Sequence, residues 1–117
     1  MLEPECVLTL ACAGNTWNPC LLALRAKGYA IQLSFTKTGE DDYHSDVTAV
    51  KDGRYFNASN SAELLGLVAM WEVRGDDWKT KPGEPDVYDE LYPSSITYDC
   101  EGNVLEVGGE PVGETPG

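Results

Sequence analysis

Alternation of hydrophobic and polar positions predicts several strands in this chain. In residues 29–36, tyrosine, isoleucine, leucine and phenylalanine occupy every second position, which is typical of a half-buried strand. Asp52-Gly53 is a strong hairpin turn that separates two further strand-like stretches. By the same reasoning, we predict further strands at residues 6–11, 43–50, 54–58, 96–99 and 104–107.

Helix start and stop residues around a run of leucines predict a first, short helix. Asn18 is a good N-cap residue, and Pro19 suits the first helical position. Leucines follow up to a basic last turn, and Gly28 then ends the helix.

A second helix of about 14 residues is predicted between Asn60 and Gly75. Asn60 and Glu63 form a capping box, and apolar residues recur at helical spacing up to Trp71. We assign the apolar stripe, with Met70 and Trp71, to packing.

The order of these elements predicts an α+β domain of the form β-α-β-β-β-α-loop-β-β. Its sheet is expected to be mainly antiparallel, with two helices packed on one face. Residues 1–107 would form one domain, and residues 108–117 a disordered tail. Residues 76–95 contain three prolines and no sustained period, so they are expected to be a long loop that packs through its aromatic residues.

Residues 18–75 resemble double-stranded-RNA-binding domains in the order of their elements: helix, three-strand meander, helix. That family holds phosphates with a lysine cluster at the start of its last helix. The corresponding residues here are Asn60-Ser-Ala-Glu-Leu, which include no cation. The resemblance is therefore limited to element order, and RNA binding is not expected.

The amino-acid composition limits the classes of molecule that the protein is expected to bind. The 117 residues include 20 acidic against 8 basic residues, a formal charge of −12. This excess lies beyond the magnitude of about 2 to 8 that suits a small domain. Such a surface repels nucleic acids and anionic lipids and attracts basic proteins. Direct binding of DNA, RNA or membranes is therefore not expected.

Residues 1–12 lack the basic start and long apolar run of an export signal, so we expect a cytoplasmic protein. Reduced thiols are expected at Cys6, Cys12, Cys20 and Cys100, mostly as buried small hydrophobic residues. These cysteines form no CxxC pair, and we predict no metal site or cofactor.

Two local patterns could carry chemistry. His44 lies two residues before Asp46, the spacing of a base and its orienting carboxylate, but no nucleophile motif accompanies them. An exposed strand position is the alternative for His44. Residues 99–103 place oxygen atoms at alternating positions, yet lack the glycine and glutamate spacing of an EF-hand, so a polar turn is expected. No glycine cluster precedes a lysine as in a phosphate-binding loop.

Negative charge is concentrated in the second part of the chain. Residues 1–75 hold nine acids and six bases, whereas residues 76–117 hold eleven acids and two lysines. Aromatic residues lie among these acids, and such a mixture suits an Arg/Lys-lined groove on a partner. The predicted partner-binding residues are Asp76, Asp77, Trp78, Glu84, Asp86, Tyr88, Asp89, Glu90 and Tyr92.

The sequence thus favours a non-enzymatic, acidic protein-binding domain that blocks a basic partner, such as a toxin, nuclease or other nucleic-acid-handling protein. In size and charge it resembles small bacterial immunity and anti-defence proteins. One alternative is a small-molecule-binding or catalytic domain with a pocket near His44 and Asp46. Another is an accessory subunit of a larger assembly. The identity of the partner and the oligomeric state are left open.

Overall fold

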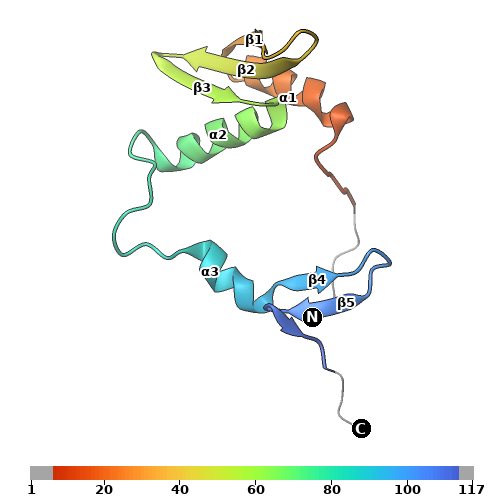
Figure 1. The fold of residues 1–117 in the computed structure, drawn as a ribbon. Coiled ribbons are helices and arrows are strands. Elements are labelled where there is room, and N and C mark those ends of the chain that lie inside the picture. Colours follow the sequence, from red (N-terminus) through yellow and green to blue (C-terminus); the bar gives the residue numbers. More distant parts are fainter. Residues whose placement is uncertain (1–6, 114–117) are drawn as a thin grey trace. The chain divides into compact units, whose positions relative to one another are not determined.

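The chain divides into two units, Met1–Trp78 and Lys79–Gly117, each described by itself below (Figure 1). The structure is a computed structural model that describes residues 7–113. The sequence predicted one domain over residues 1–107, whereas the described buried residues all lie in the first unit. The boundary between the two units, after Trp78, lies three residues beyond the composition change at Gly75.

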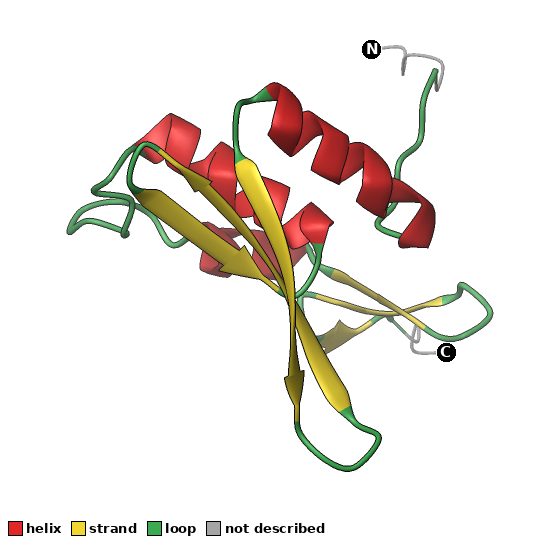
Figure 2. Ribbon diagram, turned by 90° about the horizontal axis from the view of Figure 1, so that it is seen from above, coloured by secondary structure: helices red, strands yellow, loops and turns green. Residues whose placement is uncertain are grey.

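The first unit is an α+β arrangement of two helices and a three-stranded antiparallel sheet, as predicted. The strand order is β1-β2-β3, and both helices cover the same face of the sheet (Figures 1 and 2). Its elements are α1 (Gly14–Ala26), β1 (Ala30–Lys37), β2 (Tyr43–Lys51), β3 (Arg54–Ala58) and α2 (Ser61–Arg74).

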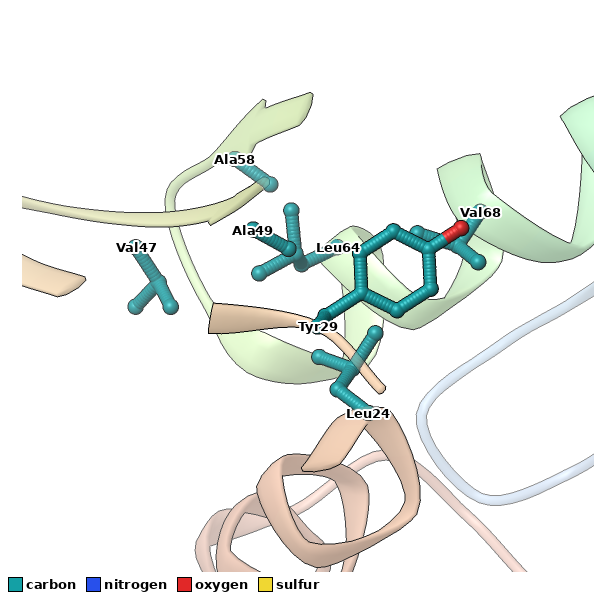
Figure 3. Packing of buried hydrophobic residues seen from close by; sticks show 7 residues of the cluster. All are labelled: Leu24, Tyr29, Val47, Ala49, Ala58, Leu64 and Val68. Carbon is teal, nitrogen blue, oxygen red and sulfur yellow. The ribbon is translucent and has the colours of Figure 1, made fainter. Parts of the chain in front are cut away.

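The core of this unit lies between the sheet and the helices. Strand register places Val47 opposite Ala58 and Ala49 opposite Phe56, so alternate residues of β2 and β3 face the helices. Figure 3 shows seven buried side chains that meet there from the strands and helices. They are Leu24, Tyr29, Val47, Ala49, Ala58, Leu64 and Val68.

Two predictions for the N-terminal region are wrong. Residues 7–11 form no strand, and residue 6 lies outside the described residues. The first helix begins at Gly14, four residues before the predicted cap, with Pro19 inside it. The Thr16 hydroxyl donates to the Ala13 carbonyl at 2.7 Å, which stabilises this earlier start.

The second helix confirms its predicted boundaries. The Asn60 side chain accepts a hydrogen bond from the Glu63 backbone N–H at 2.9 Å, and the helix contains 14 residues. Gly75 has a φ of 82°, a left-handed conformation that glycine adopts without strain, and it turns the chain out of the helix.

The second unit contains short elements only. They are α3 (Val87–Leu91), the 3-10 helix η1 (Tyr92–Ser94), β4 (Ile96–Tyr98), β5 (Val104–Val107) and β6 (Glu110–Pro111). The β4–β5 hairpin was predicted, whereas α3 lies in the predicted loop and β6 in the predicted tail. Residues 114–117 of that tail lie outside the described residues. Within residues 7–113, no helix has the length and apolarity needed to cross a bilayer.

Candidate functional site

Arg54, Trp71 and Asp76 form a hydrogen-bonded cluster in the first unit. The Asp52-Gly53 turn places Arg54 at the start of β3, and Gly75 turns the chain so that Asp76 returns to it. Arg54 donates from Nε and Nη2 to the two Asp76 oxygens at 2.7 and 2.6 Å. Trp71 Nε1 donates to the same carboxylate at 2.8 Å. The three residues thus lock the end of α2 against β3.

Hydrogen bonding sets the electrostatics of this cluster. The bonds from Arg54 and then from Trp71 lower the pKa of Asp76 from 3.8 to about 2. The hydrogen bond to Asp76, and then its negative charge, raise the pKa of Arg54 above its usual value. The carboxylate of Asp76 is therefore already engaged within the molecule, although the sequence assigned it to a partner.

Aromatic rings extend the cluster toward the core. The Phe56 ring lies edge-on between Tyr29 and Trp71, at centroid distances of 5.9 and 5.8 Å. The Arg54 guanidinium lies 4.9 Å from the centroid of the Trp71 ring, and Lys51 Nζ lies 5.4 Å from that of Tyr29. Burial and then the Glu72 charge raise the pKa of Tyr29.

Two hollows follow β3 on the side of α2. The first, of about 350 Å³, is lined by Arg54, Tyr55, Phe56, Asn57, Leu67, Met70, Trp71, Asp76 and Trp78. The second, of about 540 Å³, is lined by Asn57, Ala58, Ser59, Glu63, Gly66 and Leu67. Because Asn57 and Leu67 line both, we treat the hollows as one feature, the β3 groove. The sequence assigned Met70 and Trp71 to packing, whereas both line this groove, which the sequence did not predict. Trp71 also packs against Phe56.

The predicted partner-binding residues are divided between the two units. Asp76, Asp77 and Trp78 belong to the end of the first unit, where Trp78 lines the β3 groove. The other six, Glu84, Asp86, Tyr88, Asp89, Glu90 and Tyr92, lie in the second unit.

In the second unit, α3 gathers most of these residues. Asp86 is its N-cap and accepts a hydrogen bond from the Asp89 backbone N–H at 3.1 Å. This cap allows one short helix to display carboxylates and hydrophobic side chains together. The α3 surface, as we name it, comprises Asp86, Val87, Tyr88, Asp89, Glu90, Leu91 and Tyr92.

The second unit has no buried residue among residues 79–113. Tyr88 is 77% exposed and Leu91 60% exposed, although both carry large apolar groups. Exposed large hydrophobic side chains also occur along its strands, at Ile96, Tyr98, Val104, Leu105 and Val107. A group of apolar side chains of this size is typical of a surface that another molecule covers.

His44 and Asp46 lie on the sheet face opposite the helices. Nε2 of His44 is 3.2 Å from Oδ1 of Asp46, and the histidine side chain is 57% exposed. Strand register places His44 opposite Thr36, in the part of β2 that pairs only with β1. The pair lines neither part of the β3 groove. Its position is that of an exposed strand residue with an acidic neighbour.

The Asp99 side chain organises the β4–β5 turn. Its Oδ1 accepts from the backbone N–H groups of Glu101 and Asn103, and its Oδ2 accepts from Asn103 Nδ2 at 3.0 Å. Hydrogen bonds, those from Asn103 first, lower the pKa of Asp99. The carboxylate thus holds the turn, as the polar-turn interpretation expects. Across residues 7–113, no three His, Cys, Asp or Glu side chains are grouped so that they could hold a metal ion.

The described cysteines are free thiols at Cys12, Cys20 and Cys100. The prediction of buried cysteines is wrong for Cys12 and Cys100, which are exposed. Cys12 lies in the segment before α1, and Cys100 lies in the turn held by Asp99. Cys6 lies outside the described residues.

Comparison with known proteins gives no relative from which a function can be transferred. No family model, curated protein or solved structure matches this chain.

Proposed function

We propose that this chain is a non-enzymatic protein-binding domain of the inhibitor or immunity type, which binds and blocks a basic protein. The α3 surface carries the proposal, because it exposes Val87, Tyr88, Leu91 and Tyr92 among three carboxylates. A nuclease or another nucleic-acid-handling protein fits as the partner, since its site is built for phosphates and therefore attracts carboxylates.

Charge supports this choice of partner. Residues 79–113 contain eight acidic residues against Lys79 and Lys81, so this part of the chain has a formal charge of −6. A surface with this excess accelerates the approach of a basic protein, and salt screens the effect over about 10 Å at 0.1 M. The charge therefore favours fast association that weakens as ionic strength rises.

Exposed aromatic and aliphatic side chains supply the contact area that makes a complex dissociate slowly, which charge alone does not. Tyrosine is enriched among the residues that dominate binding energy, because its ring buries a large area and its hydroxyl keeps a hydrogen bond. Tyr88 is 77% exposed and Tyr92 50% exposed. In the proposed complex these side chains are buried, which slows dissociation. The carboxylates beside them occupy the positions of substrate phosphates.

The proposal includes a cytoplasmic location. Cys12 and Cys100 are exposed free thiols, a form that persists in a reducing compartment.

The test neutralises three carboxylates of the α3 surface together, in the variant Asp86→Asn, Asp89→Asn, Glu90→Gln. Asparagine can still cap α3 at position 86, so the helix is retained. The partner is first isolated from the source cells at low salt and eluted by a salt gradient. Stopped-flow kinetics then measure its association with both forms. We expect the variant to associate roughly three- to tenfold more slowly and with a weaker salt dependence.

A matched control has the same charge change elsewhere. The variant Glu40→Gln, Asp41→Asn, Asp42→Asn alters three acids of the β1–β2 connection in the first unit. The control is expected to keep most of the wild-type rate. Equal association rates for wild-type and α3 variants would contradict the proposal. A stoichiometric partner whose binding does not change with salt would instead indicate an accessory subunit.

A further inference from the structure

Strand β3 has a free edge. In the order β1-β2-β3 it pairs with β2 on one side, and no described strand pairs with its other side. Such an edge presents backbone N–H and C=O groups that can pair with another extended chain. The edge spans the five residues of β3, or roughly 17 Å at the rise of an antiparallel strand.

The β3 groove is lined by residues of this strand and of α2. Figure 1 shows the two elements next to each other. It extends from Arg54 at the start of β3 to Ser59 just after its end. The groove therefore has the length of the free strand. A round pocket for a small molecule would not follow a strand in this way, whereas an added strand would.

The side chains along the groove are mainly apolar. Phe56, Leu67, Met70, Trp71 and Trp78 contribute to its lining, and Leu67 lines both of its parts. Leu67 is 38% exposed, so a bound side chain would cover it further. An added strand directs every second side chain toward such a lining, while the intervening side chains point away.

Gly66 leaves open space on the α2 side of the groove. It lies inside α2, where glycine is unfavourable, and a Cβ atom built on it meets no heavy atom within 4 Å. Open space at this position lets an approaching backbone come close to the helix.

Charge at the two ends of the groove differs. Arg54 and Asp76 neutralise one another at one end. Glu63 lies at the other end, where its backbone N–H is bound by Asn60 and its side chain is exposed. With a net charge of −12 on the whole chain, this end favours a cationic side chain on the occupant.

We propose that the β3 groove binds an extended segment of a partner protein by strand addition to β3. The segment has about five or six residues, with apolar residues at alternate positions and a lysine or arginine that reaches Glu63. A second copy of this chain fits less well, because it would bring another −12 charges and another Glu63 to the same place. The inference is independent of the α3 surface, which lies in the other unit.

The experiment begins with random decapeptides displayed on phage and selected on the full chain. We expect enriched peptides to alternate apolar and polar residues and to contain a basic residue. The strongest peptide is then synthesised, and its Kd is measured for wild-type protein and for Leu67→Gln, which removes apolar surface shared by both parts of the groove. The variant is expected to bind roughly tenfold or more weakly.

Two controls separate strand addition from nonspecific contact. Val73→Gln changes an 86% exposed residue of the same helix outside the groove lining, and it should bind the peptide as wild-type does. Two further peptides each carry N-methyl groups on one of the two alternate sets of amides. Only one of these sets points its N–H groups at β3, so one of the two N-methylated forms should not bind. The binding of N-methylated peptides tests strand addition even if Leu67→Gln unfolds.

Three results would overturn the inference: no enriched peptide, equal Kd values for Leu67→Gln and Val73→Gln, or undiminished binding of both N-methylated forms. The triple α3 variant distinguishes this inference from the proposed function. It should bind the peptide with an unchanged Kd while its association with the basic partner slows.

Discussion

Asp76 illustrates how a residue's role depends on contacts that its sequence neighbours do not show. By composition it belongs to the acidic region that begins after Gly75, and it was predicted to bind a partner. In the structure its carboxylate accepts hydrogen bonds from Arg54 and Trp71. The Gly75 turn brings the three together, and this geometry cannot be deduced from residue spacing alone.

The lowered pKa of Asp76 predicts a pH dependence of stability. Because its pKa falls from 3.8 to about 2 on folding, the ionised form stabilises the native state above pH 3.8, and this contribution is lost as pH falls toward 2. The variant Asp76→Asn should be less stable than wild type near pH 6 and should lose less stability between pH 4 and 2. Urea unfolding at each pH measures this.

Asp41→Asn serves as the comparison, since Asp41 lies in the β1–β2 connection. It should retain the acid sensitivity of the wild type. Parallel pH profiles for wild type and Asp76→Asn would show that the cluster does not contribute to folding.

Element boundaries follow the sequence where capping residues act locally. Helix α2 begins after Asn60, whose side chain caps Glu63, and ends before Gly75, as predicted. The start of α1 departs from prediction because the Thr16 hydroxyl bonds to Ala13, so the helix begins before Asn18. The short helix α3 has a cap, Asp86, but five residues are too few for a period to be visible.

Helix α2 contains a glycine whose replacement should stabilise the protein. Gly66 has helical backbone and open space around the position of a Cβ atom. Gly66→Ala is therefore expected to raise the free energy of unfolding by about 0.5–1 kcal/mol, since glycine loses more backbone entropy on folding. Thermal denaturation followed by circular dichroism measures the change.

Gly75→Ala is the matched control at the end of the same helix. Its φ of 82° is strained for alanine, so this variant should unfold at a lower temperature than wild type. A rise in Tm for both variants, or for neither, would contradict the backbone argument.

At the scale of the whole molecule, the α+β class and the helix-meander-helix order are confirmed. The division into two units was not predicted. Periodicity shows which residues are apolar, but it does not show which of them share a core. Tyr98 and Val104 carry large apolar side chains like Tyr29 and Val47, yet both are exposed. Periodicity also does not give the order of strands in a sheet. The β3 groove could therefore not be predicted, because only the strand order shows that β3 is an edge strand.

The two units predict different behaviour for fragments. Within residues 7–113, the seven buried hydrophobic residues all fall in the range from Leu24 to Val68, so fragment 1–78 should fold alone and give a dispersed NMR spectrum. Fragment 79–117 has no buried residue in its described part and should give the narrow dispersion of an unfolded peptide.

Two-dimensional ¹H–¹⁵N spectra of both fragments, overlaid on that of the full chain, test this. Fragment 1–78 should reproduce the chemical shifts of its core residues. A dispersed spectrum from fragment 79–117 alone would show that the second unit needs no cover for its apolar side chains.

The seven buried residues of the first unit end at Val68, and Asp76, which bonds to Arg54 and Trp71, also precedes the unit boundary at Lys79. Proteins are synthesised from the N-terminus, and domains fold as units while synthesis continues. On the ribosome, the first unit can therefore fold while Lys79 and later residues are still inside the exit tunnel. The α3 surface then emerges attached to a folded first unit, so a partner that binds it as proposed would meet a chain whose first unit already exists.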